Sequence, residues 1–285
     1  MNTATDPVVR VRGLRMRYGQ TDVVRGVDLD VCRGEILALL GPNGAGKTTT
    51  LEILQGYRHR SGGDVSVLGV DPQHAPDAWR ERVGVVLQSW RDHAQWRVGE
   101  LLEHAALLYS RPRDVSELLD LVGLTEHRRK TIGVLSGGQR RRLDVALGVV
   151  GRPELLFLDE PTAGFDPVAR RQFHELVQHL AAVEGVTVLL TTHDLAEAER
   201  LADRIAILVR GSLTACGTAD ELAEAAEDES EVRWRHGRNL THEFTRDPSA
   251  LVYRLHQEFE GPIPDLVVRR PTLEDTYLSM VKGDR

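Results

Sequence analysis

The residues with the clearest chemical potential form a short glycine-rich segment near the start of the chain. Positions 41–48 read Gly-Pro-Asn-Gly-Ala-Gly-Lys-Thr and satisfy the pattern G-x-x-x-x-G-K-T. Glycines at this spacing let consecutive backbone N–H groups turn inward around phosphate oxygens, and the positive end of a following helix adds to the attraction. In such a loop Lys47 reaches the β- and γ-phosphates, and the Thr48 hydroxyl binds Mg²⁺.

The flanking sequence predicts the two elements that a phosphate loop requires. Residues 36–40 are an uninterrupted apolar run, typical of a parallel strand buried on both faces. Residues 49–55 suit a helix, and Gly56 is placed to end it. The competing interpretation is a plain glycine turn between a strand and a helix of an unrelated α/β protein. The complete motif in this context favours the phosphate loop.

A second strand pattern delivers two carboxylates. Residues 155–160 read Leu-Leu-Phe-Leu-Asp-Glu, which predicts a buried parallel strand that ends in acids at the edge where open α/β sheets bind ligands. Asp159 would hold magnesium directly or through water, and Glu160 would orient or deprotonate an attacking water. The alternative is that both acids merely end the strand and cap the next turn.

The sequence Leu-Ser-Gly-Gly-Gln at positions 135–139 predicts a rigid, electropositive helix start. Ser136 and Gln139 can cap one another's backbone donors, and the helix would run through Val149. These are the properties of a second anion site. In isolation the pattern is an ordinary helix start, and it becomes informative only beside a phosphate loop.

Two further polar residues stand where predicted strands end. Gln88 follows the apolar run at 83–87, and His193 follows the strand predicted for residues 186–191. A glutamine in this position is usually a solvated loop residue, and an isolated histidine is more often a structural group than a catalytic one. Next to a helix that Asp194 and Glu197 can cap, His193 is placed to contact a γ-phosphate.

The overall composition limits the class of protein. The 36 basic and 43 acidic residues give a net charge of −7, which argues against a large nucleic-acid surface. No stretch approaches the ~18 apolar residues of a membrane-spanning helix, and the N-terminus lacks the layout of a signal peptide. Cys32 and Cys216 are too few for a disulfide framework. We therefore expect a cytosolic chain with no nucleic acid as partner.

Strand and helix patterns divide the chain into regions. Alternation at residues 8–18 and 27–31 predicts an antiparallel sheet ahead of the phosphate loop, and Tyr18 either caps the core of that sheet or stacks on a purine base. Beyond residue 219 the sequence becomes acidic and alanine-rich, followed by two predicted strands around a helix. The expected regions are a nucleotide-binding domain at 1–220, a helical subdomain within it at about 90–150, and an extension at 221–285.

Together these motifs resemble the nucleotide-binding subunit of an ATP-binding cassette (ABC) transporter, over roughly residues 8–220. The resemblance implies that ATP and Mg²⁺ bind and that ATP is hydrolysed. The residues that it implies for ATP binding within the chain are Tyr18, Gly41, Pro42, Asn43, Gly44, Ala45, Gly46, Lys47, Thr48 and Thr49. Those implied for ATP bound by the other subunit are Ser136, Gly137, Gly138, Gln139 and Asp166. Catalytic roles fall to Glu160, His193 and Gln88, and the magnesium ligands are Thr48, Gln88 and Asp159.

The resemblance also implies an architecture. The fold class is α/β, a P-loop NTPase (RecA-like) with a mixed sheet core, an N-terminal antiparallel β subdomain, an inserted helical signature subdomain and a small α+β C-terminal extension. In this fold the signature helix is too distant to close over the phosphate loop of its own chain. We therefore expect a head-to-tail homodimer with two ATP molecules between its subunits.

The C-terminal ending narrows the expected role. Residues 270–278, Arg-Pro-Thr-Leu-Glu-Asp-Thr-Tyr-Leu, resemble the ending of ATPase subunits of the daunorubicin/doxorubicin-resistance type. That type serves exporters whose membrane permease is a separate chain, which implies a peripheral location on the inner face of the cell membrane and a drug, antibiotic or lipid-like substrate. Trp90 and Trp96 either line the groove for a permease helix or pack within the helical subdomain. Phe165 stands where the family commonly has leucine, a change we expect to be tolerated.

Two other functions compete with export. A soluble cassette ATPase acting on nucleic acid or ribosomes would generally carry a coiled-coil insertion, zinc modules or two cassettes, and the sequence shows none of these. A nucleotide kinase would share the phosphate loop but has no use for the signature sequence.

Overall fold

The computed structural model describes residues 7–87, 93–224, 230–237, 239–259, 261–269 and 272–282. The chain divides into two compact units, Met1–Cys216 and Gly217–Arg285. This division falls four residues before the boundary expected after residue 220. The first unit contains two sheets and the second unit one, and each unit has its own core.

The first unit is built on a six-stranded sheet with the order β5-β6-β7-β3-β8-β9. Four neighbouring pairs in it, from β5 to β8, are parallel, so the carboxyl ends of these strands meet at one edge. The strands β3, β6 and β7 are buried along their whole length, as the continuous apolar runs of the sequence predict. The bounds are β5 Val83–Val86, β6 Leu155–Asp159, β7 Thr187–Thr192, β3 Ile36–Leu40, β8 Arg204–Val209 and β9 Ser212–Gly217.

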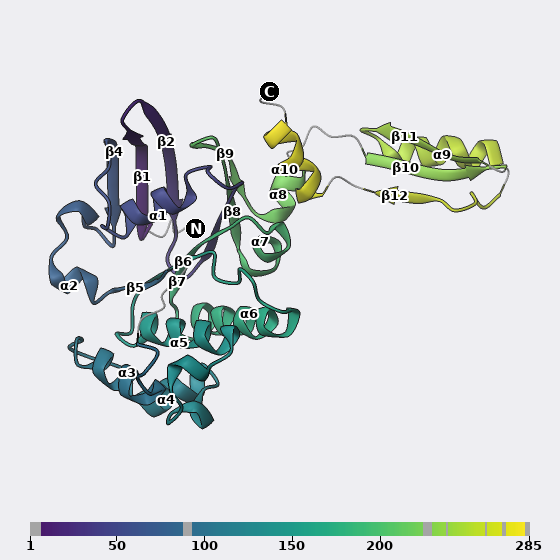
Figure 1. Cartoon of the computed structure of the whole chain (residues 1–285). Helices are drawn as coiled ribbons and strands as arrows, with labels where there is room; N and C mark the ends of the chain where they lie inside the picture. Colours follow the sequence, from purple (N-terminus) through teal and green to yellow (C-terminus); the bar gives the residue numbers. More distant parts are fainter. Residues whose placement is uncertain are drawn as a thin grey trace, which may run out of the picture. The chain divides into compact units, whose positions relative to one another are not determined.

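A small antiparallel sheet and one helix cover one face of the central sheet (Figure 1). The small sheet has the order β2-β1-β4, with β1 at Val9–Tyr18, β2 at Thr21–Val31 and β4 at Gly62–Val67. Alternate residues of the central strands, including Leu37, Leu39 and Phe157, share a core with this sheet and with the helix α1, Lys47–Leu54. The antiparallel sheet predicted ahead of the phosphate loop is present. It also includes β4, which follows the loop in the sequence.

The other face of the central sheet carries the longer helices. The helices α5, Gly137–Val149, and α6, Pro167–Ala182, contact β5 and β7 and also each other (Figure 1). The helix α7, Leu195–Leu201, contacts β3 and β7. The remaining helices of this unit are α2 Asp77–Arg80, α3 Val98–Ala106 and α4 Val115–Leu121, with short 3-10 turns at Pro72–His74, Thr125–His127 and Ile132–Val134.

The described residues of the second unit form three strands and three helices. Its sheet has the antiparallel order β11-β10-β12, and α9 packs on Val232 and Trp234 of β10 through Leu251 and Leu255. The Thr276 hydroxyl of α10 donates to the Leu222 carbonyl of α8 at 3.1 Å. The bounds are α8 Ala219–Glu224, β10 Ser230–His236, β11 Asn239–Thr245, α9 Pro248–Phe259, β12 Val267–Arg269 and α10 Leu273–Lys282.

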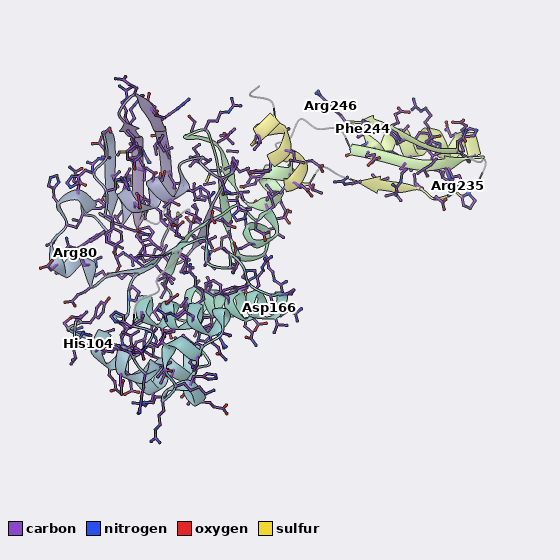
Figure 2. The ribbon with its side chains drawn as sticks, viewed as in Figure 1. Arg80, His104, Asp166, Arg235, Phe244 and Arg246 are labelled. Atoms are coloured by element: carbon purple, nitrogen blue, oxygen red, sulfur yellow. The ribbon has the colours of Figure 1, made fainter. Side chains whose placement is uncertain are left out.

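The sequence patterns do not predict the strand β11. Its residues are exposed or half-buried throughout, and Phe244, labelled in Figure 2, is 56% exposed. The strand has just two apolar residues, Leu240 and Phe244, with His242 between them, and this pattern is too weak to predict a strand. Across the described part of both units, no helix has the length and apolar character needed to cross a membrane.

Candidate functional site

The glycine-rich loop connects β3 to α1, as its sequence predicts. Gly46 adopts a φ of 104° immediately before α1, and a Cβ there would lie 2.9 Å from the Val23 carbonyl oxygen. At Gly41 a Cβ would lie 2.2 Å from the Leu208 carbonyl oxygen. Side chains at these two positions would force the loop away from the strands behind it. Glycine therefore permits both the left-handed backbone at Gly46 and the close packing of the loop.

The Lys47 ammonium group points back into the loop. The side chain is 5% exposed, and Nζ donates to the carbonyl oxygens of Gly41 at 2.8 Å and Pro42 at 3.3 Å. Nζ also lies 3.5 Å from Oε1 of Glu160, which follows β6. The lysine of the loop and the predicted catalytic carboxylate thus belong to one site.

The carboxylate of Glu160 lies between Lys47 and His193. Its Oε1 is 3.4 Å from Nδ1 of His193, and the histidine side chain is 52% exposed while that of Glu160 is 14% exposed. The backbone N–H of Glu160 donates to the carbonyl and hydroxyl oxygens of Thr191, at 3.1 and 3.0 Å. Residues that follow β3, β6 and β7 therefore meet at the edge formed by the carboxyl ends of these strands.

Oxygen groups suited to a hard cation lie beside this carboxylate. The Thr48 hydroxyl is 3.4 Å from Oδ1 of Asp159, which is 5% exposed and also accepts a 2.5 Å hydrogen bond from the Thr191 hydroxyl. A carboxylate and a hydroxyl on facing elements fit Mg²⁺, which usually binds through one or two carboxylates plus substrate phosphates and water. The described residues contain no cluster of three or more His, Cys, Asp or Glu that would hold a metal without a nucleotide.

The helix tip at Ser136 has the predicted reciprocal cap. The Ser136 hydroxyl accepts from the Gln139 N–H at 3.3 Å, and Oε1 of Gln139 accepts from the Ser136 N–H at 3.0 Å. Nε2 of Gln139 lies 3.0 Å from Nε2 of His127, whose pKa is lowered by burial. A neutral His127 can accept this bond, which holds the amide of Gln139 in the orientation that completes the cap.

Asp166 and Tyr18 show contacts within their own chain. The Asp166 carboxylate caps α6 by accepting from the N–H groups of Val168 and Ala169, both at 2.9 Å, and Figure 2 labels it at the start of that helix. Tyr18 is 40% exposed, and the Arg58 guanidinium lies over its ring at 5.2 Å from the centroid. This exposure argues against the interpretation that Tyr18 caps the core of its sheet.

Gln88 and Trp90 lie outside the described residues. Trp96 makes edge contacts with the rings of His93 and His104, at centroid distances of 5.4 and 5.3 Å, and is 37% exposed. These contacts favour packing within the helical subdomain.

The structure adds residues that sequence patterns did not reveal. Arg141 is 6% exposed and bonds the backbone on both sides of Glu160. The sequence suggests that Asp194 and Glu197 can both cap α7, but the Glu197 carboxylate is buried, accepts from the Thr162 hydroxyl at 2.6 Å and lies 3.5 Å from Nε2 of His174. Only Asp194 caps that helix, by accepting from the Glu197 N–H at 3.2 Å. Acidic and basic residues in amphipathic helices are usually solvated, so neither role was visible in the sequence.

Comparison with known proteins gives a consistent result. The sequence model of the ABC transporter family matches residues 24–163. A daunorubicin resistance ATP-binding protein of Streptomyces coeruleorubidus is 37% identical, over 98% of this chain and 98% of its own length. A fluoroquinolones export ATP-binding protein of Mycobacterium tuberculosis is 40% identical, over 75% of this chain and 72% of its own. Among solved structures, an ATP-binding subunit of an ABC transporter superposes with a TM-score of 0.68 at 28% identity, covering 76% of this chain and 92% of its own.

Proposed function

The chain belongs to the ATP-binding subunits of ABC transporters, and we propose that it drives export as a head-to-tail homodimer bound to a separate membrane permease. Binding and hydrolysis of ATP for an export system follow from this membership. The dimer, the permease, the magnesium ion and the roles of individual residues belong to the proposal. The relatives named above give no support to the alternative, an ATPase that acts on nucleic acid or ribosomes.

The observation that carries the proposal is the position of one carboxylate. Glu160 Oε1 lies 3.5 Å from the phosphate-loop lysine and 3.4 Å from His193. The lysine marks where the β- and γ-phosphates bind. A carboxylate next to that position is placed to orient, or to take a proton from, the water that attacks the γ-phosphate. His193, on the exposed side of the same carboxylate, would contact the γ-phosphate.

Catalysis by these residues rests on positioning and on charge stabilisation. The loop N–H groups and Lys47 hold the phosphate chain, and Glu160 is fixed through its backbone bonds to Thr191. Thr48 and Asp159 would hold Mg²⁺, with Gln88 as a further predicted ligand. When bound, the metal would neutralise charge on the β- and γ-phosphate oxygens.

The positions of α1 and α5 support a site shared by two chains. The phosphate loop leads into α1 on one face of the central sheet, whereas Ser136 caps α5 on the other face (Figure 1). The Ser136–Gly137 tip is exposed, which leaves it open to the nucleotide of a second chain. A second copy in head-to-tail orientation would bring its Ser136, Gly137, Gly138 and Gln139 to the γ-phosphate.

The partner and the substrate are inferred from the relatives. Proteins named for daunorubicin resistance and for fluoroquinolone export support a drug-like organic molecule as the exported substrate. We propose that a permease recognises this molecule and holds the ATPase dimer at the inner face of the cell membrane. Copurification of the tagged chain with the permease, followed by drug-stimulated ATP hydrolysis in vesicles, tests this part of the proposal.

Replacement of the proposed catalytic carboxylate tests the site itself. We expect Glu160→Gln to lower the hydrolysis rate at saturating Mg·ATP by about 10²-fold or more, because the variant cannot accept a proton from water. It should still form an ATP-dependent dimer, measured by light scattering after size exclusion, since the phosphate loop is intact. Glu199→Gln, an exposed position on α7, is the matched control and should hydrolyse ATP normally. An unchanged rate in Glu160→Gln would refute the assignment.

A further inference from the structure

One buried arginine joins three parts of the first unit that lie far apart in sequence. Nε of Arg141 donates to the Pro161 carbonyl and Nη2 donates to the Asp159 carbonyl, both at 2.9 Å. Nη1 donates to the carbonyl of Leu87, which follows β5. All three acceptors are backbone oxygens, and two of them flank Glu160 in the sequence. The guanidinium therefore holds the backbone that carries the proposed catalytic carboxylate.

The same arginine lies on the helix that presents the signature tip. Arg141 is five residues after Ser136, in the second turn of α5. Further along α5, Gly148 packs against β5 so closely that a Cβ on Gly84 would lie 2.2 Å from the Gly148 carbonyl oxygen. The helix is thus fixed to the sheet at two places, the arginine near its start and the glycine contact near its end. The direction in which the Ser136 tip points depends on both.

We propose that Arg141 is a positioning residue for ATP hydrolysis. It fixes the position of the signature tip of α5, which begins at Ser136, relative to the Glu160 carboxylate. This inference rests on the proposed roles of Glu160 and Ser136. Those two groups act on different nucleotides in the dimer, one in its own chain and one across the interface. A rigid link between them means that the two sites of the dimer take up their catalytic geometry together.

The link requires the shape of a guanidinium and not just a positive charge. Five N–H groups in a planar fork reach three carbonyl oxygens from different directions, whereas a lysine ammonium is a single point that cannot span them. The carboxylate of Asp144 is 3.9 Å from Nη1, a longer contact than the 2.9 Å bonds to the Pro161 and Asp159 carbonyls. The guanidinium of Arg141 is therefore held mainly by its hydrogen bonds to backbone carbonyls.

The test separates catalytic positioning from nucleotide binding. In the full-length chain we expect Arg141→Lys to lower kcat for Mg·ATP by about tenfold or more, because small displacements of catalytic groups have large effects on rate. The Kd for a fluorescent N-methylanthraniloyl ADP should stay within about twofold of wild type, because Arg141 has no bond to the phosphate loop among its contacts above. Arg141→Gln, whose amide can donate to two of the carbonyls, is the second variant if the lysine variant does not fold.

Controls make each outcome decisive. Arg142→Lys changes the next residue of α5, whose Nη1 donates to the carbonyls of Val122 and Gly123 at 3.3 and 3.4 Å, and it should keep wild-type kcat. A kcat of Arg141→Lys within twofold of wild type would overturn the inference, and so would a parallel loss of kcat, ADP affinity and Tm. Glu160→Gln is assayed alongside: if that variant still hydrolyses ATP, the proposed site is wrong, independently of Arg141.

Discussion

Glu160 adopts a backbone conformation that glutamate rarely uses. Its φ is 41°, in the left-handed region, where a residue with a Cβ is strained by about 1 kcal/mol or more. The bonds from its N–H to the two oxygens of Thr191 hold it there. This turn of the backbone directs the carboxylate towards Lys47 and His193 instead of along the strand direction. The strain is thus located at the residue proposed to act on water.

Asp144 is a buried carboxylate with an unusual pKa. Burial raises its pKa to about 6, against an ordinary 3.8, and the arginines at 3.7 and 3.9 Å, Arg140 and Arg141, offset this only in part. Because the folded chain holds this proton more tightly than the unfolded chain, the group favours folding at low pH. That contribution is lost as the pH rises through about 6.

We therefore expect Asp144→Asn to alter how stability depends on pH. The free energy of unfolding of the wild type should fall by roughly 1 kcal/mol more than that of the variant between pH 5 and pH 7.5. Urea denaturation of both chains at the two pH values measures this double difference, in which the other titrating groups cancel. Identical changes in the two chains would show that the carboxylate is not held protonated by burial.

At the scale of elements, sequence patterns predict what is buried or capped locally. The strands β3 and β6, the loop before α1 and the Ser136–Gln139 cap all depend on neighbours within a few residues, and each is present. The strand β11 depends on pairing with β10 and buries neither face, so its own residues do not predict a strand. The role of Arg141 likewise depends on carbonyls 20 and 54 residues away, which no local pattern encodes.

The contact between β5 and α5 should be intolerant of even one methyl group. A Cβ on Gly84 would lie 2.2 Å from the Gly148 carbonyl oxygen and 2.9 Å from Cδ1 of Leu156. We expect Gly84→Ala to lower the free energy of unfolding by about 1–3 kcal/mol, since helix and strand must separate to admit the methyl group. Equilibrium denaturation by urea measures the loss.

The matched control for this element is Gly62→Ala in β4. It too lacks a positive φ, and its Cβ would meet only Arg15 atoms at 3.9 Å or more. The methyl group fits there, and replacing glycine lowers the conformational entropy of the unfolded chain, so stability should stay equal or rise slightly. If both alanine variants lose stability equally, close packing between β5 and α5 is not the cause.

At the scale of the whole molecule, the family membership and the two-sided sheet lead to the same architecture. The phosphate loop leads into α1 on one face of the sheet and the capped tip begins α5 on the other (Figure 1), and we propose that these are two half-sites completed by a second chain. The second unit, with its own sheet and core, contributes none of the predicted site residues. Two copies of the first unit are therefore sufficient, in our proposal, to form both ATP sites.

Mixing two inactive variants tests this arrangement. Lys47→Ala disables the phosphate loop, and Ser136→Arg blocks the helix tip with a large side chain, so each variant alone should be inactive. In a head-to-tail heterodimer of the two, one site would combine the intact loop of one chain with the intact tip of the other. Random mixing makes half of the dimers mixed, each with one complete site of two, so we expect about a quarter of the wild-type rate.

The control mixes the Lys47→Ala chain with a chain that carries both Lys47→Ala and Ser136→Arg. This mixture has no complete site and should stay inactive. If the first mixture is as inactive as its components, while both variants still form dimers with each other, the tip does not act on the neighbour's nucleotide.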